Sequence, residues 1–242
     1  MKKLFITLTA IVVMAFCANA QVNIQEQYDF NREHLTTTLE MFKTDNWGST
    51  FFFTDIYHPT QYSAPMGYYT EIARGLNFWQ DTKLGGLSAH VEWNGGQLAN
   101  RAWLFGAEYL LHSSDFRYTL TLEVLYKTIV DSKQDVPMQF TIVWGCNDIF
   151  GVKGLTFSGF ADLWWENLEW GTKDNGEPDK TNVVFISEPQ IWYNIGQFFN
   201  CPNLNIGGEV EFAYNFAGAW RPVFNDNKGL TVAPACGIKW NF

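Results

Sequence analysis

The clearest pattern along this chain is a strict alternation of apolar and polar residues in segment 116–128. One face carries Tyr118, Leu120, Leu122, Val124 and Tyr126, and the other carries Arg117, Thr119, Thr121, Glu123, Leu125 and Lys127. Because successive side chains of a β-strand point to opposite faces, this alternation predicts a strand with one apolar face. The apolar face begins and ends in tyrosine, which is typical of the aromatic girdles of a membrane-spanning strand. Charged side chains facing lipid would cost roughly 2–4 kcal/mol each near mid-bilayer, so we expect the polar face to look inward.

The same two-residue period recurs along most of the chain. In three further segments the expected outward residues are Leu87, Ala89, Val91 and Trp93; Leu155, Phe157, Leu163 and Trp165; and Leu204, Ile206, Val210, Phe212, Tyr214 and Phe216. Strands are expected near residues 22–31, 35–43, 48–58, 67–79, 87–94, 102–112, 116–129, 138–148, 155–168, 183–195, 204–216 and 230–242. The pattern therefore predicts an all-β fold, a transmembrane antiparallel β-barrel of about twelve strands, with ten as the fallback because the first two segments are the least regular.

The last predicted strand ends on bare aromatic residues. Trp240 and Phe242 lie on one face of segment 230–242. In an outer-membrane barrel the last strand closes the ring and turns this face toward lipid. We therefore expect recognition by the barrel-assembly machinery through Trp240 and Phe242. If both ends of the chain are periplasmic, the two longest connections, 169–182 and 217–229, lie on the external side.

The first twenty residues have the features of a secretory signal peptide. Lys2 and Lys3 precede an apolar run that ends at Phe16, and Ala18 and Ala20 flank a small-residue cleavage site. This predicts a signal peptide over 1–20, a barrel domain over 21–242 and an outer-membrane location. A lipoprotein anchored through Cys17 is the alternative, and the bulk of Phe16 before that cysteine disfavours it.

Composition supports a membrane barrel and excludes several other classes. Aromatic residues make up 17% of the chain, and charged residues also make up 17%, against about 25% charged in ordinary soluble domains. No segment holds about 18 uninterrupted apolar residues. A periplasmic β-sandwich would share the alternation but not the aromatic excess. The formal net charge of −9 lacks the basic footprint of a nucleic-acid-binding protein.

Cysteine usage predicts neither a disulfide framework nor a metal site. Cys146, Cys201 and Cys236 remain after removal of the signal peptide, an odd number at scattered spacing. The acidic stretch 169–179 does not have the ligand spacing of a calcium loop and is expected to be a solvated loop. We therefore expect no cofactor and no metal, and a monomeric barrel in the lipid bilayer.

The expected inward faces combine carboxylates with aromatic rings. Rings provide stacking surfaces for a planar solute, and carboxylates accept hydrogen bonds from it. The predicted substrate-binding residues of the lumen are Phe53, Asp55, Tyr57, Glu71, Phe160, Asp162, Trp164, Glu188, Trp192, Glu209 and Glu211. The alternative is that these groups only fill and solvate the interior. Arg74 is an exception, because it faces outward if Glu71 faces inward; a bulge near Gly75 or a position at the rim would accommodate it.

Five stretches carry a family resemblance. They are Phe51–Tyr57 (FFFTDIY), Glu71–Leu76 (EIARGL), Phe157–Asp162 (FSGFAD), Ser187–Tyr193 (SEPQIWY) and Gly207–Phe212 (GGEVEF). Together they resemble the Tsx-type nucleoside-specific channel-forming proteins of the outer membrane, over most of the mature chain, although the loops here are shorter. The resemblance implies a twelve-stranded barrel with a narrow channel that binds nucleosides.

The functional hypothesis is therefore passive uptake of a small solute, with nucleosides or similar ring-bearing molecules as the expected class. The acidic lining predicts cation over anion selectivity. A structural or adhesive barrel without transport is one alternative, and a barrel enzyme is another. An enzyme would need clustered acid–base groups, and His90 and His112, two of four histidines, are expected at different heights in the barrel.

Overall fold

The computed structural model describes residues 20–242 apart from 60–66, 98–100 and 217–227. The predicted signal peptide therefore lies outside the described residues, except for Ala20. The strands are β1 (Ala20–Asp29), β2 (His34–Asp45), β3 (Gly48–Pro59), β4 (Gly67–Leu76), β5 (Leu87–Gly96), β6 (Ala102–His112), β7 (Tyr118–Ile129), β8 (Met138–Asn147), β9 (Leu155–Thr172), β10 (Pro178–Ser187), β11 (Gln190–Tyr193), β12 (Leu204–Tyr214) and β13 (Leu230–Asn241). Two short 3₁₀ turns, η1 (Ile149–Gly151) and η2 (Ile195–Phe198), lie in connections.

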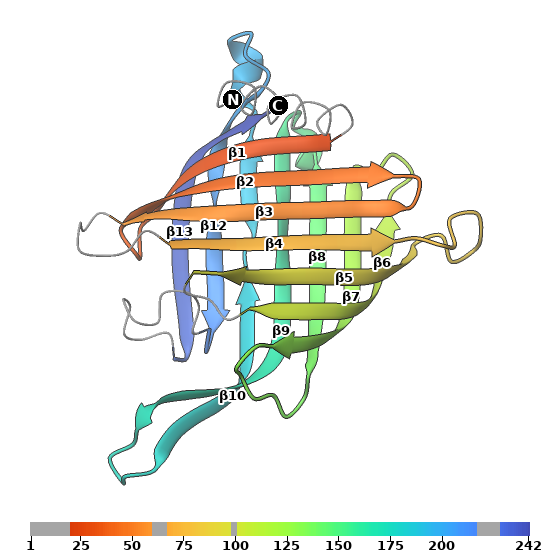
Figure 1. Ribbon diagram of the computed structural model, residues 1–242. Helices are drawn as coiled ribbons and strands as arrows, with labels where there is room; N and C mark the ends of the chain where they lie inside the picture. Colours follow the sequence, from red (N-terminus) through yellow and green to blue (C-terminus); the bar gives the residue numbers. More distant parts are fainter. Residues whose placement is uncertain (1–19, 60–66, 98–100, 217–227) are drawn as a thin grey trace, which may run out of the picture.

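All strands belong to one closed antiparallel sheet. From β1 to β9 each strand pairs with the next one in the chain, and β10 and β11 both pair with β9 and with β12. β12 pairs with β13, and β13 closes the ring onto β1, from Asn23 opposite Asn241 to Asp29 opposite Ala235. Strands β1 to β5 form one wall and cross in front of β8, β9, β12 and β13 (Figure 1). β10 and β11 follow one another in the same position between β9 and β12, so together they count as one strand of the ring. The barrel wall is therefore crossed twelve times by the chain. The predicted twelve-stranded β-barrel is confirmed.

The tenth crossing is interrupted at Glu188 and Pro189. Proline has no N–H to donate to a sheet ladder, so the strand breaks there into β10 and β11. The break is bridged by two backbone bonds, from the Glu188 amide to the Phe160 carbonyl at 3.1 Å and from the Val210 amide to the Pro189 carbonyl at 3.1 Å. The sequence had predicted one continuous strand here, over 183–195.

The predicted inward and outward faces are found in the barrel. On β7, Leu122 is 41% exposed on the outside, whereas Glu123 and Lys127 are buried inside. On β5, the four predicted inward residues Ser88, His90, Glu92 and Asn94 are all buried. A sheet whose exposed exterior is apolar and aromatic fits contact with lipid rather than water. In the part of the chain that the structure describes, no helix is long and apolar enough to cross a membrane.

One outward assignment, Phe216, was wrong. Asn215 has φ of 53°, so the chain leaves the extended conformation just after β12 and the alternation ends. The Asn215 side chain holds this turn by donating to the Val183 carbonyl at 3.1 Å and accepting from the Gly229 amide at 2.9 Å. Phe216 consequently turns back and packs edge-on against Trp164, with ring centroids 5.8 Å apart.

Arg74 lies outside, at the rim. The pairing of β4 with β3 and with β5 is continuous through Gly75, which excludes a bulge. The guanidinium donates to Thr50 Oγ1 and to Asp45 Oδ1, both at 2.8 Å. Asp45 ends β2, so Arg74 reaches toward the barrel end at which β1 begins and β13 ends, as expected of a snorkelling side chain.

The two ends of the barrel differ in their connections. β1 begins and β13 ends at one end of the barrel, the terminal end, and the long β9–β10 hairpin projects from the other, the loop end (Figure 1). The predicted long loop 169–182 is wrong, because β9 and β10 extend through most of it and leave only 173–177 as the turn. Trp170 supports this extension by donating from Nε1 to Thr181 Oγ1 at 2.7 Å.

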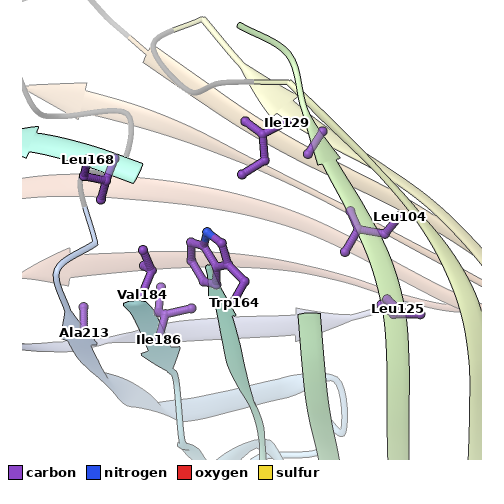
Figure 2. Packing of buried hydrophobic residues seen from close by; sticks show 9 residues of the cluster. Leu104, Leu125, Ile129, Trp164, Leu168, Val184, Ile186 and Ala213 are labelled. Atoms are coloured by element: carbon purple, nitrogen blue, oxygen red, sulfur yellow. The ribbon is translucent and has the colours of Figure 1, made fainter. Parts of the chain in front are cut away.

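An apolar cluster fills part of the interior toward the loop end. Trp164 lies between Leu104 and Leu125 on one side and Val184, Ile186 and Ala213 on the other (Figure 2). Leu104, Leu125 and Val184 have no exposed surface. Within the described residues this cluster is the apolar core of the barrel, and it confines the polar part of the lumen to the remaining space.

Candidate functional site

The lumen holds a polar cavity of about 710 Å³. Its wall is formed by side chains from β1 to β9 and from β11 to β13. Gln80 and Phe116, which lie in connections at the terminal end, belong to the wall, so the cavity reaches that mouth. Nine of the eleven predicted binding residues line it, namely Phe53, Asp55, Tyr57, Glu71, Phe160, Asp162, Glu188, Glu209 and Glu211.

Trp164 and Trp192 point inward as predicted but do not line the cavity. Trp164 belongs to the apolar cluster, and the ammonium of Lys127 lies over its ring at 4.0 Å. Trp192 is only 1% exposed, and Lys239 covers its ring at 4.3 Å. Strand alternation correctly predicts that both side chains point inward. Each indole face is nevertheless covered by a neighbouring lysine, so it is not available to stack on a solute.

Aromatic rings follow one another along β3 and β4. Phe53 lies between Phe51, at 5.8 Å between ring centroids, and Tyr69, at 5.9 Å. The Tyr69 hydroxyl donates to Glu71 Oε1 at 2.5 Å. Tyr69 was not among the predicted residues, although its spacing of two from Glu71 on the same strand places it on the inward face.

One acidic group surrounds Arg32 near the loop end. Arg32 lies in the connection between β1 and β2 and bonds Asp29 at 2.8 Å and Glu211 at 2.5 Å. Burial by itself would lower the pKa of the guanidinium, but the charges of Glu211 and Asp29 raise it above its ordinary value. The ion pairs tie this connection to β12, which is separated from β1 only by β13 in the ring. Sequence analysis missed Arg32, because a loop residue has no strand period that assigns it to a face.

Two further carboxylates of this group, Asp55 and Glu209, are held by neutral donors. Thr38 donates to Asp55 Oδ1 at 2.5 Å, and Gln190 donates to Glu209 Oε2 at 2.8 Å. Glu188 lies at the interruption between β10 and β11 and lines the cavity beside them. This side of the lumen therefore presents acceptor oxygens with fixed positions.

A second acidic group centres on His90. His90 Nδ1 lies 2.6 Å from Glu108 Oε2, and His90 Nε2 lies 3.3 Å from Glu92 Oε2. Glu123 Oε2 lies 3.9 Å from Nδ1. His112, the other histidine expected inside, is exposed at the terminal end and stacks on Phe116 at 3.8 Å between ring centroids. Gly106 pairs with His90, so His112 is six residues away along β6, about 20 Å at ~3.4 Å per residue.

A ladder of amides on β1 also escaped prediction. Asn23, Gln25 and Gln27 are buried and bond in series, Gln25 to Asn23 at 3.0 Å and Gln27 to Gln25 at 3.2 Å. Asn23 continues the series to Glu40 Oε1 at 2.8 Å. The sequence signal that could have found this ladder is a polar residue at every second position from Asn23 to Asp29. Charged Glu26 on the outer face of the same segment obscured the alternation of apolar and polar residues.

The net charge of the cavity wall is strongly negative if its carboxyl groups are ionised. Among the described residues of the wall, twelve are Asp or Glu, and Arg32 is the single Lys or Arg. Such a wall attracts cations, and it accepts hydrogen bonds from hydroxyl and N–H groups. Polyanions would be repelled.

Comparison with known families and structures supports the fold. A family model described as "Domain of unknown function (DUF5020)" matches residues 20–242. No curated protein matches the chain. The solved NanC porin is similar with a TM-score of 0.55 and 8% identity, over 91% of this chain and 100% of that one. The KdgM porin aligns with a TM-score of 0.49 and 8% identity, over 92% of this chain and 99% of that one. At 8% identity, the likeness to NanC concerns the barrel architecture alone.

Proposed function

The chain belongs to the DUF5020 family, and we propose that it is an outer-membrane channel for passive uptake of small solutes. The observation that carries the proposal is a closed barrel whose exterior is apolar and whose interior holds a polar, acidic cavity. An apolar exterior with aromatic girdles is suited to a bilayer, and a polar interior to an aqueous path. Secretion with a signal peptide cleaved after Ala20, assembly through Trp240 and Phe242, and a monomeric state are parts of the same proposal.

We further propose that the solute is neutral or cationic and carries a planar ring, with nucleosides as the first candidates. Phe53 and Phe160 offer ring faces on the cavity wall, and Glu209 and Asp162 offer acceptors on the same wall. Stacking of a base on an aromatic side chain contributes about 1–3 kcal/mol, and ribose hydroxyls would donate to the carboxylates. Transport requires weak binding, so we expect affinities between micromolar and millimolar. The resemblance to Tsx-type channels points to the same solutes.

Planar-bilayer recording of the refolded mature protein tests the channel. We expect a cation-selective current, seen as a shifted reversal potential in a salt gradient. Glu188→Gln combined with Glu209→Gln should move the reversal potential toward zero. The matched control is Asp174→Asn combined with Glu177→Gln, which removes two charges from the exposed β9–β10 turn and should leave selectivity unchanged. Anion selectivity in the unmodified protein would contradict the proposal.

Solute specificity is tested in the same recordings. Added nucleoside should reduce the current in a saturable way, and Phe160→Leu should weaken that effect about fivefold, the equivalent of ~1 kcal/mol of lost stacking. Phe140→Leu is the matched control, because Phe140 is 43% exposed on the outer face of β8. If nucleosides, sugars and amino acids all leave the current unchanged, the specific channel is wrong.

A structural barrel without transport is the second candidate. It is favoured by the apolar cluster around Trp164 and by the Arg32 ion pairs, which together occupy the interior toward the loop end. The absence of any current from correctly folded protein would support this candidate over the channel.

A further inference from the structure

Three neighbouring strands bring an imidazole and two carboxylates together on the lumen wall. His90 lies on β5, Glu108 on β6 and Glu123 on β7. One ligand atom from each of them lies within 4.8 Å of the other two. All three side chains line the cavity, so an ion that enters the lumen can reach them.

The charges in this cluster are unbalanced. Glu108 and Glu123 are directly opposite each other in the pairing of β6 with β7, an arrangement that destabilises a sheet when both side chains are ionised. Glu92 adds a third carboxylate at 3.3 Å from the imidazole. Lys127, the buried cation on β7, donates instead to Gln139 at 2.6 Å. A single imidazolium would offset one of three negative charges, whereas a divalent cation would offset two.

The histidine is oriented as a metal ligand usually is. Its Nε2 faces Glu92 Oε2 at 3.3 Å, and Asn94 donates to the other oxygen of Glu92 at 2.9 Å. A carboxylate on one imidazole nitrogen fixes the ring and leaves the second nitrogen free to bind a metal. That second nitrogen, Nδ1, is the atom that faces Glu108 and Glu123.

Space for the cluster depends on a glycine. Gly75 of β4 pairs with His90, and a Cβ built on Gly75 would lie 2.2 Å from Glu108 Oε1. Any other residue there would displace the carboxylate. The absence of a side chain on β4 thus keeps Glu108 in position beside the imidazole.

We propose that His90, Glu108 and Glu123 bind a divalent transition-metal ion of the Zn²⁺ type in the lumen wall. One nitrogen and two carboxylate oxygens suit this class of ion, and bonds of about 2.0–2.1 Å in tetrahedral geometry place ligand atoms ~3.3 Å apart. The distances from Nδ1 to Glu108 and Glu123, 2.6 and 3.9 Å, bracket that value. Because all three side chains line the cavity, water from the cavity would supply the fourth ligand. The sequence predicted no metal site, because ligands on three strands share no local spacing.

Isothermal titration of the chelator-treated, detergent-solubilised mature barrel with ZnCl₂ tests the site. We expect one ion per chain, and at least tenfold weaker binding in His90→Gln and in Glu108→Gln. His112→Gln removes an exposed histidine at the terminal end and should bind as the unmodified barrel does. Equal binding by His90→Gln, or no stoichiometric binding by the unmodified barrel, would overturn the proposal.

A second measurement needs no variant and covers the case in which substituted barrels fail to fold. The unmodified barrel loaded with one Cu²⁺ should show, in pulsed electron paramagnetic resonance, coupling to the nitrogen of a single imidazole. Absence of that coupling would also overturn the site. Neither experiment depends on transport, so their failure leaves the channel proposal standing, and a failed channel leaves the metal site testable.

Discussion

A single arginine placed on either face of β7 distinguishes the lipid side of the barrel from the lumen side. Leu122 lies midway between Tyr118 and Tyr126, which are 46% and 50% exposed on the same outer face. From Tyr118 to Tyr126 the strand rises ~3.3 Å for each of eight residues. With a strand tilt of ~40° from the membrane normal, this segment spans about 20 Å of membrane thickness. Leu122 therefore lies near the middle of a band about 25 Å tall. Its partners Tyr109 and Ile142 are also exposed outward.

Leu122→Arg should destabilise the folded barrel by roughly 2–4 kcal/mol, the cost of arginine at the bilayer midplane. Since each 1.4 kcal/mol is a factor of ten, the folding equilibrium constant should fall about 30- to 700-fold. Thr121→Arg is the matched control. Thr121 lines the cavity, as do Leu110 and Val143 beside it, so its guanidinium would meet water and carboxylates.

Reversible urea titrations in lipid vesicles, followed by tryptophan fluorescence, would measure both changes. Heat-modifiable mobility on a gel reports whether each variant reaches the barrel fold. Thr121→Arg should stay within about 1 kcal/mol of the unmodified protein, as expected away from buried or lipid-facing positions. Equal losses from the two substitutions would refute the lipid-facing register of β7.

Three further predictions follow from particular positions. Gly159→Ala should destabilise the barrel by about 1–3 kcal/mol in the same urea titration, because Gly159 has φ of 152° and a Cβ there would lie 2.4 Å from the Glu188 carbonyl oxygen. Gly145→Ala should cost clearly less, since its added Cβ would meet only the rotatable Thr119 hydroxyl at 2.8 Å; the reverse order would contradict the argument. Reduction should leave the intact mass of the mature protein unchanged, because its three cysteines lie on β8, on β13 and in the connection before β12. Mass spectrometry of protein recovered from outer membranes should show cleavage after Ala20, and a retained or lipidated N-terminal segment would contradict this.

Most of the fold followed from local alternation. A membrane barrel has one apolar and one polar face along every strand, so the period of two in segments such as 87–94 and 116–128 is enough to assign both the strands and their faces. The assignment failed where backbone conformation departs from an extended strand, at Asn215 and at Pro189. It also failed over 169–182, where the β9–β10 hairpin continues beyond the apolar pattern because its backbone pairs and the Trp170 contact hold it.

The sequence by itself therefore determined the face of most residues within the regular strands, but not which of the inward residues meet in the interior. Period-two alternation carries no information about contacts between neighbouring strands, which depend on register and closure of the ring. Register placed Glu108 opposite Glu123 and His90 beside Gly75, and so created a cluster that no local spacing encodes. Tertiary packing also keeps Trp164 and Trp192 out of the cavity wall, because the ammonium groups of Lys127 and Lys239 lie over their rings. A strand by itself thus fixes the face on which each side chain lies, whereas side chains from different strands form a site only once the barrel has closed.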